Sequence, residues 1–262
     1  MVSDGRIHLE MEDGIATVIV DRPAKRNALT APMRRTLLEA LRRANESPMA
    51  QVLIITGVGD SFCAGGDIEV LKHLKANEDE AGFEQLLDDG REIVGLLRAS
   101  MKPSLAMVNG PAFGAGFFMA LACDLRLCGN SASFGAPFVR LGLGPDWGGT
   151  YLLPRLVGNA KALELLYTGA GIDAAEALRI GLANRVCPDA DLKASVMKLA
   201  RELAERPPQV LARYKQAIHA TWDMSFDATA DMERRLQLQN FRAPDFAEGI
   251  AAFLEKRPPN FG

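Results

Sequence analysis

The chain has 262 residues, of which 48% are apolar and 24% charged, and its 30 basic and 33 acidic side chains give a formal net charge of −3. The apolar content excludes a chain that is disordered as a whole, and the absence of a basic excess argues against sequence-blind binding of nucleic acid. The length suits one large domain, or a domain with an appendage.

Short apolar runs alternate with helical patterns in the first half of the chain. Thr30, with Pro32 just inside, marks the start of a helix that runs to about residue 45. A second, apolar helix is expected at residues 117–122. Strands separated by helices indicate parallel βα units. The expected strands are residues 15–20, 52–56, 104–108 and 125–128.

The second half of the chain changes character. Asp173 and Glu176 form a capping-box pattern that opens a helix ending at Gly181. Further helices are expected at 191–205, 208–222, 226–240 and 244–255. We therefore expect a mixed core at residues 1–190 and a helical region at 191–262. The acidic stretch 77–85 is either a mobile surface segment or a solvated helix face.

Several classes of site and location are disfavoured. The four cysteines form no CxxC pair, and the three histidines lack metal-ligand spacing, so we expect no metal site and a reducing, cytoplasmic location. No signal peptide is apparent, and glycines interrupt the uncharged run 103–123, which disfavours a membrane span. No nucleotide-binding loop and no GxSxG serine elbow occurs.

Two glycine-rich segments, residues 61–68 and 108–116, each follow a strand and open a helix. Small residues there would let a ligand approach backbone N–H groups at the positive end of a helix. Two such groups converging on one oxygen atom would form an oxyanion hole. The alternative is tight packing between strand and helix.

Acids are scarce in the middle of the chain, since only Asp124 and Asp146 lie between Lys102 and Arg155. Asp124 sits between an apolar helix and a strand, which indicates a structural cap or ion pair. Asp146 lies among glycines, where it either shapes a turn and caps a helix or acts as a general acid/base. In the second case it would share an apolar pocket with the aromatic side chains of Trp147, Phe118 and Phe138, and burial would raise its pKa.

These residues together resemble the enoyl-CoA hydratase/isomerase (crotonase) family over essentially the whole chain. The Pro-Asp-x-Gly-Gly-Thr pattern at 145–150 is most similar to phenylacetyl-CoA ring-epoxide isomerases and enoyl-CoA isomerases. The other matching segments are 107–124, 62–68, 21–29, 153–155, 170–182 and 253–257.

The resemblance implies an α/β fold, a crotonase-like spiral of ββα units followed by a C-terminal α-helical trimerisation region. It implies an acyl-CoA thioester as substrate, with coenzyme A as part of that substrate and no separate cofactor. It also implies a homotrimer or hexamer, and neither a nucleic-acid nor a membrane partner is expected.

The resemblance assigns roles to individual positions. The backbone N–H groups of Gly66 and Ala115 would hold the thioester oxygen as enolate charge develops on it. Phe253 and Lys256 would reach the coenzyme A of a neighbouring subunit. The positions that would line the coenzyme A channel are Arg26, Ala28, Ala64, Asp67 and Ile68.

The chain departs from the family hydratases at the two positions where those enzymes carry glutamates, which are here Phe118 and Phe138. Only Asp146 remains, and one carboxylate can carry a proton from one carbon to another, so we expect an isomerase that shifts a double bond or isomerises a ring epoxide.

Two alternatives stay open. The first is a hydratase or other lyase with a second acid from outside the usual motif positions, for which Glu84, Asp88 and Glu92 are the candidates. The second is a non-catalytic acyl-CoA-binding homologue.

Overall fold

The computed structural model describes residues 5–261, and its core is a six-stranded sheet in the order β1-β2-β3-β4-β6-β9. β1 pairs antiparallel with β2, and every other neighbouring pair in this sheet is parallel. The strands are β1 (Arg6–Glu12), β2 (Ile15–Asp21), β3 (Val52–Gly57), β4 (Ser104–Val108), β6 (Leu125–Gly129) and β9 (Arg185–Cys187).

A second, three-stranded sheet in the order β5-β7-β8 lies beside the first. Its strands are β5 (Ala112–Phe113), β7 (Ser133–Gly135) and β8 (Ile172–Asp173). The isolated bridge between Cys63 and Ala112 brings the loop that follows β3 next to this small sheet. The two glycine-rich segments of the sequence therefore meet where the sheets adjoin.

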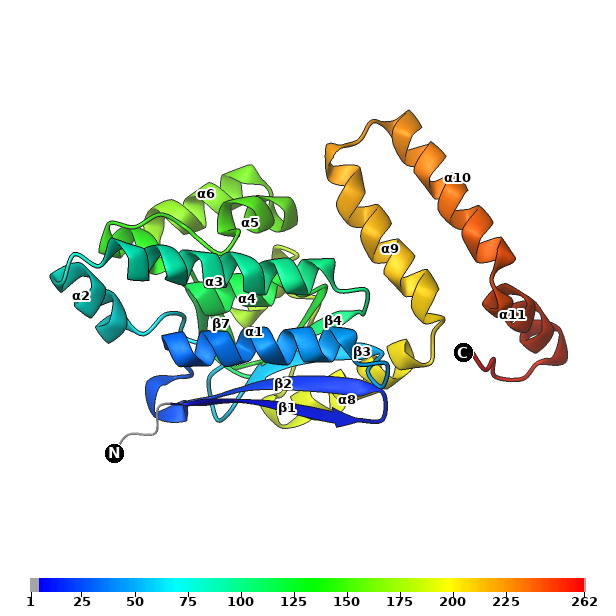
Figure 1. Ribbon diagram of the computed structural model, residues 1–262, viewed down its shortest axis with the longest axis horizontal. Helices are drawn as coiled ribbons and strands as arrows, with labels where there is room; N and C mark the ends of the chain where they lie inside the picture. Colours follow the sequence, from blue (N-terminus) through cyan, green and yellow to red (C-terminus); the bar gives the residue numbers. More distant parts are fainter. Residues whose placement is uncertain (1–4, 262) are drawn as a thin grey trace.

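Helices cover both faces of the large sheet because its parallel strands carry apolar side chains on both sides. Leu53 and Ile55 of β3 point into the core shared with the helices α1 and α3, while Val52 and Ile54 point to α8 on the other face (Figure 1). The first-half helices are α1 (Ala31–Glu46), α2 (Ile68–Ala76), α3 (Glu80–Ala99), α4 (Ala115–Ala122), α5 (Gly149–Val157) and α6 (Asn159–Thr168). The remaining helices are α7 (Ala174–Arg179), α8 (Leu192–Ala204), α9 (Pro208–Ala220), α10 (Phe226–Arg242) and α11 (Pro244–Glu255).

The acidic stretch 77–85 is a solvated helix face rather than a loop over most of its length. Asp79 caps α3 by accepting a hydrogen bond from the Gly82 N–H at 2.9 Å, and the helix then runs for 20 residues. One side of α3 is buried through Leu86, Ile93 and Leu97, which explains why so acidic a segment is ordered.

The helical region begins at α8, two residues after the expected boundary near 190. α8 packs beneath the large sheet through Leu192, Val196 and Ala200, whereas α9, α10 and α11 extend away from the core as an arm (Figure 1). No helix within the described residues is long and apolar enough to cross a membrane.

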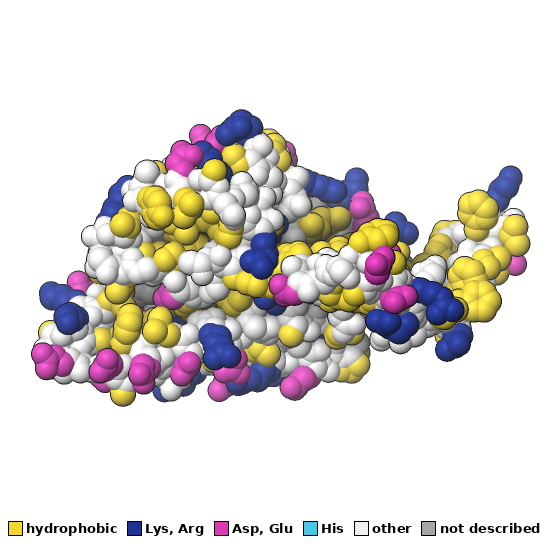
Figure 2. Space-filling view, turned by 90° about the horizontal axis from the view of Figure 1, so that it is seen from above, with side chains coloured by type: hydrophobic (Ala, Val, Ile, Leu, Met, Phe, Trp, Pro, Cys, Tyr) yellow, Lys and Arg dark blue, Asp and Glu magenta, His cyan; other side chains and the backbone are white. Residues whose placement is uncertain are grey.

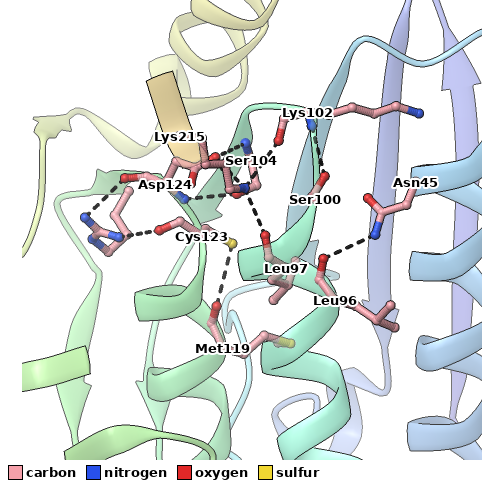
Figure 3. Close-up of polar contacts among 11 residues, drawn as sticks. Asn45, Leu96, Leu97, Ser100, Lys102, Ser104, Met119, Cys123, Asp124 and Lys215 are labelled. Carbon is pink, nitrogen blue, oxygen red and sulfur yellow. Dashed lines mark hydrogen bonds and ion pairs between the residues drawn. The ribbon is translucent and has the colours of Figure 1, made fainter. Parts of the chain in front are cut away.

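Asp124 joins the arm to the core, which confirms its expected structural role. Its Oδ2 atom accepts hydrogen bonds from the backbone N–H and the hydroxyl of Ser104, at 2.7 and 2.9 Å, and from Lys215 Nζ of α9 at 2.9 Å (Figure 3). Lys215 also donates to the Leu97 carbonyl oxygen at 2.9 Å. The Lys215 side chain is only 8% exposed, so removing the Asp124 carboxylate would leave a buried ammonium group without its counter-charge.

Candidate active site

The two glycine-rich segments pack directly against each other. The Phe113 N–H donates to the Cys63 carbonyl oxygen at 2.9 Å, which fixes the loop before α4 against the loop before α2. Gly65 has φ +96°, and a Cβ atom added there would lie 2.8 Å from the Phe113 carbonyl oxygen and 3.1 Å from the Ala115 amide nitrogen. Only glycine allows this approach of backbone to backbone.

The loop contacts leave two backbone N–H groups free to face a ligand. Leu29 N–H donates to the Gly65 carbonyl oxygen and Asp67 N–H donates to the Leu29 carbonyl oxygen, so the intervening N–H of Gly66 points away from that pairing. Ala115 is the first residue of α4, where an amide N–H has no partner within the helix. Within residues 5–261 neither N–H takes part in a hydrogen bond.

Both amides line one cavity of about 200 Å³. α1 and α3 form one wall of it, and the segment from the 3₁₀ helix Pro137–Leu141 to α5 forms another. The cavity is mainly apolar, and Arg34 and Asp146 supply its only charged side chains among the described residues. The other lining residues are Leu29, Ala64, Ile68, Leu71, Phe83, Leu86, Gly114, Pro137, Phe138, Leu141, Leu143 and Trp147.

Asp146 is the one carboxyl group among the described lining residues. Its Oδ1 atom is buried and has no hydrogen-bond partner within residues 5–261. Burial raises the pKa of this carboxyl from 3.8 to about 6. The N-cap position of α5 is Gly148, and no side chain caps that helix, so Asp146 does not serve as a helix cap. A carboxyl group in an apolar cavity whose pKa is raised toward neutrality can both accept and return a proton near neutral pH.

Trp147 fixes the backbone next to this carboxyl. The residue has φ +46°, a left-handed conformation that is strained for a bulky side chain, and it is only 4% exposed. Its indole packs on α3 at Gly90, where an added Cβ would come within 2.1 Å of Trp147 Nε1. This packing holds the strained turn and thereby orients Asp146.

Phe118 and Phe138, which the resemblance places at the two glutamate positions of family hydratases, lie in different layers. Phe138 is half-buried and lines the cavity, whereas Phe118 is completely buried and lies outside the cavity lining. Their rings stack with centroids 5.6 Å apart and an interplanar angle of 4°. Phe118 thus stacks on the ring of Phe138 from the core side and belongs to the hydrophobic core.

Two of the five residues expected along the coenzyme A channel line the cavity, whereas Arg26, Ala28 and Asp67 do not. Ala64 and Ile68 line the cavity, and Ile68 is 54% exposed. Asp67 is buried, pairs with Arg22 Nη1 at 2.5 Å and caps α2 by accepting from the Glu69 N–H. Arg26 is exposed with φ +49°, and Ala28 is buried beside it.

Phe253 and Lys256 lie at the C-terminal end of α11, on the arm and away from the cavity of the same chain (Figure 1). Phe253 is 83% exposed, and Lys256 is exposed as well. Neither residue contributes to the cavity within one chain.

The three acids considered for a hydratase are not brought into the cavity. Glu84, Asp88 and Glu92 are exposed on α3, and Glu92 forms an ion pair with Arg42. Sequence reasoning instead overlooked Arg34, a cavity residue paired with the buried Asp89. Among residues 5–261 no group of three or more His, Cys, Asp or Glu side chains could hold a metal ion.

The sequence profile of the enoyl-CoA hydratase/isomerase family matches residues 10–262. The chain belongs to the enoyl-CoA hydratase/isomerase family. Among curated members of this family, the chain is 39% identical to a crotonyl-CoA hydratase of Syntrophomonas wolfei over 97% of both proteins. It is 36% identical to the 1,2-epoxyphenylacetyl-CoA isomerase of Escherichia coli over 96% of both.

Solved structures of the family share the fold of this chain. A crystal structure of an enoyl-CoA hydratase from Polaromonas superposes with a TM-score of 0.94 and 33% identity, covering 98% of this chain and 100% of that one. The expected crotonase fold is therefore confirmed, and so is the membership of the chain in an enzyme family that acts on acyl-CoA thioesters.

Proposed function

We propose that the protein is an acyl-CoA isomerase that moves a double bond by a proton shuttle through Asp146. The observation that carries this proposal is the half-buried Asp146 carboxyl, whose Oδ1 atom is enclosed without a hydrogen-bond partner among the described residues, in the cavity lined by Gly66 and Ala115. No second carboxyl group among the described residues lines that cavity, and activating water while delivering a proton normally takes two.

The proposed reaction starts from a β,γ-unsaturated thioester. The Asp146 carboxylate removes a proton from the α-carbon. The electron pair of that C–H bond forms a double bond between the α-carbon and the carbonyl carbon, and the π pair of the carbonyl group moves onto the thioester oxygen while the β,γ double bond stays in place. Negative charge collects on the thioester oxygen, where the N–H groups of Gly66 and Ala115 stabilise it. The protonated Asp146 then gives its proton to the γ-carbon, which bonds it with the β,γ π pair. The pair between the α-carbon and the carbonyl carbon shifts to form the α,β double bond, and the thioester carbonyl re-forms.

A screen of unsaturated thioesters tests this function. We expect trans-3-hexenoyl-CoA to be converted to its 2-enoyl isomer, with deuterium appearing at the α- and γ-carbons when the reaction runs in D2O. Crotonyl-CoA should keep its enoyl absorbance, because no second acid is present to activate water. Loss of that absorbance with formation of a 3-hydroxyacyl product would instead establish a hydratase.

The hydratase remains the second candidate because one similar relative is a crotonyl-CoA hydratase. It would require a water molecule to be activated without a second carboxyl in the described cavity lining. The relative that acts as a 1,2-epoxyphenylacetyl-CoA isomerase supports isomerisation of a ring-bearing acyl group instead. A protein that binds these thioesters and turns none of them over would be a non-catalytic homologue.

We also propose that the active assembly is a homotrimer or a hexamer built through the arm. Apolar side chains gather on the projecting part of the molecule, among them Phe226 and Phe253, which are 84% and 83% exposed (Figure 2). Covering such a surface with further copies would remove it from water. Sedimentation equilibrium is expected to give three or six times the chain mass, and a stable monomer would contradict the assembly.

A further inference from the structure

The cavity contains one feature that the proton shuttle does not use, the side chain of Arg34. Arg34 projects from α1, and Asp89 faces it from α3; the residues are only 3% and 5% exposed. Arg34 Nε donates to Asp89 Oδ2 at 2.9 Å, and Gln85 Nε2 donates to Asp89 Oδ1 at 2.9 Å. Both oxygen atoms of Asp89 are therefore occupied, and the carboxylate is held in a fixed orientation.

The guanidinium of Arg34 is only partly used by this arrangement. Its two Nη atoms carry four N–H donors, and within residues 5–261 none of them donates to a protein acceptor. Neither Nη atom is among the fully enclosed polar atoms that lack a partner in the described part of the chain. Arg34 lines the cavity, so a ligand that enters the cavity lies within reach of this side chain.

We infer that Arg34 selects the acyl group, by donating hydrogen bonds to an uncharged oxygen atom that the acyl group carries beyond its reacting carbons. A hydroxyl, keto or ring-ether oxygen would satisfy donors that a plain hydrocarbon leaves unpaired inside an apolar cavity. Binding sites with buried polar groups discriminate strongly against analogues that lack the matching group.

The charges around the cavity exclude an acyl carboxylate as the preferred partner. Asp89 already neutralises Arg34, so the pair has no net charge to offer. A second carboxylate would then stand in the same cavity as Asp146 with no cation to compensate it. An uncharged acceptor meets the free N–H groups without this penalty.

Arg34 acts on a different part of the substrate from Asp146. Burial dominates the raised pKa of Asp146, and Arg34 is not among the charges that influence it. Arg34 also shares its wall with Phe83 and Leu86 of α3, whereas the Gly66 and Ala115 amides belong to the two glycine-rich loops. An acyl group held by its thioester at those loops would thus present its distal part to Arg34. This inference rests on the proposed acyl-CoA substrate.

The test compares matched ligands by isothermal titration calorimetry on the wild-type protein. One series is phenylacetyl-CoA with its 2-, 3- and 4-hydroxy derivatives, and the other is hexanoyl-CoA with its 4-, 5- and 6-hydroxy derivatives. We expect at least one hydroxylated ligand to bind about tenfold or more tightly than its parent. The 4-carboxy derivative of phenylacetyl-CoA is expected to bind more weakly than the hydroxylated ligand.

The double variant Arg34→Leu/Asp89→Leu removes the donors without leaving an unpaired buried charge. It should lose the preference while binding the parent thioester within about threefold of wild type. If the double variant fails to fold, Arg34→Lys takes its place. It keeps a cation for Asp89 but removes the planar fork of donors, and it should lose most of the preference for hydroxylated ligands.

Equal binding of parent and hydroxylated ligands in both series would overturn the inference, as would a preference that survives in the folded variants. In those cases the pair only clamps α1 to α3. Failure of the proposed isomerase function is seen separately, because it is measured by turnover of unsaturated thioesters and the ligands used here need no turnover.

Discussion

Asp146→Asn is expected to lower kcat for isomerisation by about 10²–10⁴-fold, the range that a positioned acid/base group contributes. The amide is nearly the same size as the carboxylate but cannot carry a proton between carbons. Acyl-CoA affinity should stay within about threefold of wild type, since the thioester oxygen is held by the Gly66 and Ala115 amides. The check is kcat from a continuous enoyl absorbance assay together with Kd from calorimetry.

The pH profile supplies an independent signature of the same group. Burial raises the Asp146 pKa to about 6, and the first step needs the carboxylate, so kcat/KM should fall about tenfold per pH unit below pH 6. The residual activity of Asp146→Asn should lack this limb. A variant that keeps near wild-type turnover and the same acid limb would show that another residue moves the proton.

The same substitution is expected to stabilise the folded protein at neutral and alkaline pH. A pKa raised from 3.8 to about 6 means that the folded state binds the proton more tightly, so stability falls as the pH rises through that window. The shift corresponds to about 2 kcal/mol after allowance for partial exposure of the carboxyl. Asp146→Asn should therefore raise the free energy of unfolding by about 2 kcal/mol at pH 8 and by little below pH 4, measured by urea denaturation. If Asp146→Asn instead lowers the free energy of unfolding at pH 8, contacts of the carboxylate outweigh the desolvation penalty of its burial.

The elements that sequence reasoning located are those with strong local signals. Thr30 caps α1 by accepting from the Met33 N–H, with Pro32 in the first turn, and Asp173 caps α7 in the same way. The strands β2, β3 and β4 are fully or largely buried, so they read as continuous apolar runs. In such segments the local preference and the tertiary environment agree.

What the sequence does not reveal, the strand β1 and the packing partner of α8, depends on tertiary contacts. β1 is an edge strand with partly or fully exposed residues, so it lacks an apolar run, and only its pairing with β2 defines it. The core helix α8 resembles the arm helices in its sequence spacing, yet it packs beneath the sheet. Spacing shows that a helix has an apolar face but not what that face will contact.

In the candidate site, too, local sequence signals identify some residues, whereas others become apparent only from tertiary contacts. The scarcity of acids singled out Asp146, and the glycine-rich segments marked the two loops that the structure brings together. Arg34 and Asp89 lie 55 residues apart in the chain, so nothing local reveals their pairing. Phe118 and Phe138 are alike in the sequence, and only the packing distinguishes the cavity residue from the core residue beneath it.

Gly65→Ala is expected to lower kcat by about 10²–10³-fold, comparable to removing one donor from an oxyanion hole. The new Cβ would lie 2.8 Å from the Phe113 carbonyl oxygen and 3.1 Å from the Ala115 amide nitrogen, and these backbone atoms must shift to admit it. The positive φ of +96° adds strain for an alanine, so we also expect a loss of about 1–3 kcal/mol in stability.

The comparison that isolates the oxyanion effect uses two ligands and a control variant. A thioether analogue of the acyl-CoA lacks the carbonyl oxygen, so Gly65→Ala should bind it like wild type while binding the thioester more weakly. Gly95→Ala, in α3 with open space around its Cβ position, should leave turnover unchanged and raise stability by up to about 1 kcal/mol. Equal losses of affinity for thioether and thioester would mean that the substitution closes the cavity instead of displacing the donor. Wild-type turnover in a folded Gly65→Ala variant would mean that the Ala115 amide does not hold the reacting oxygen.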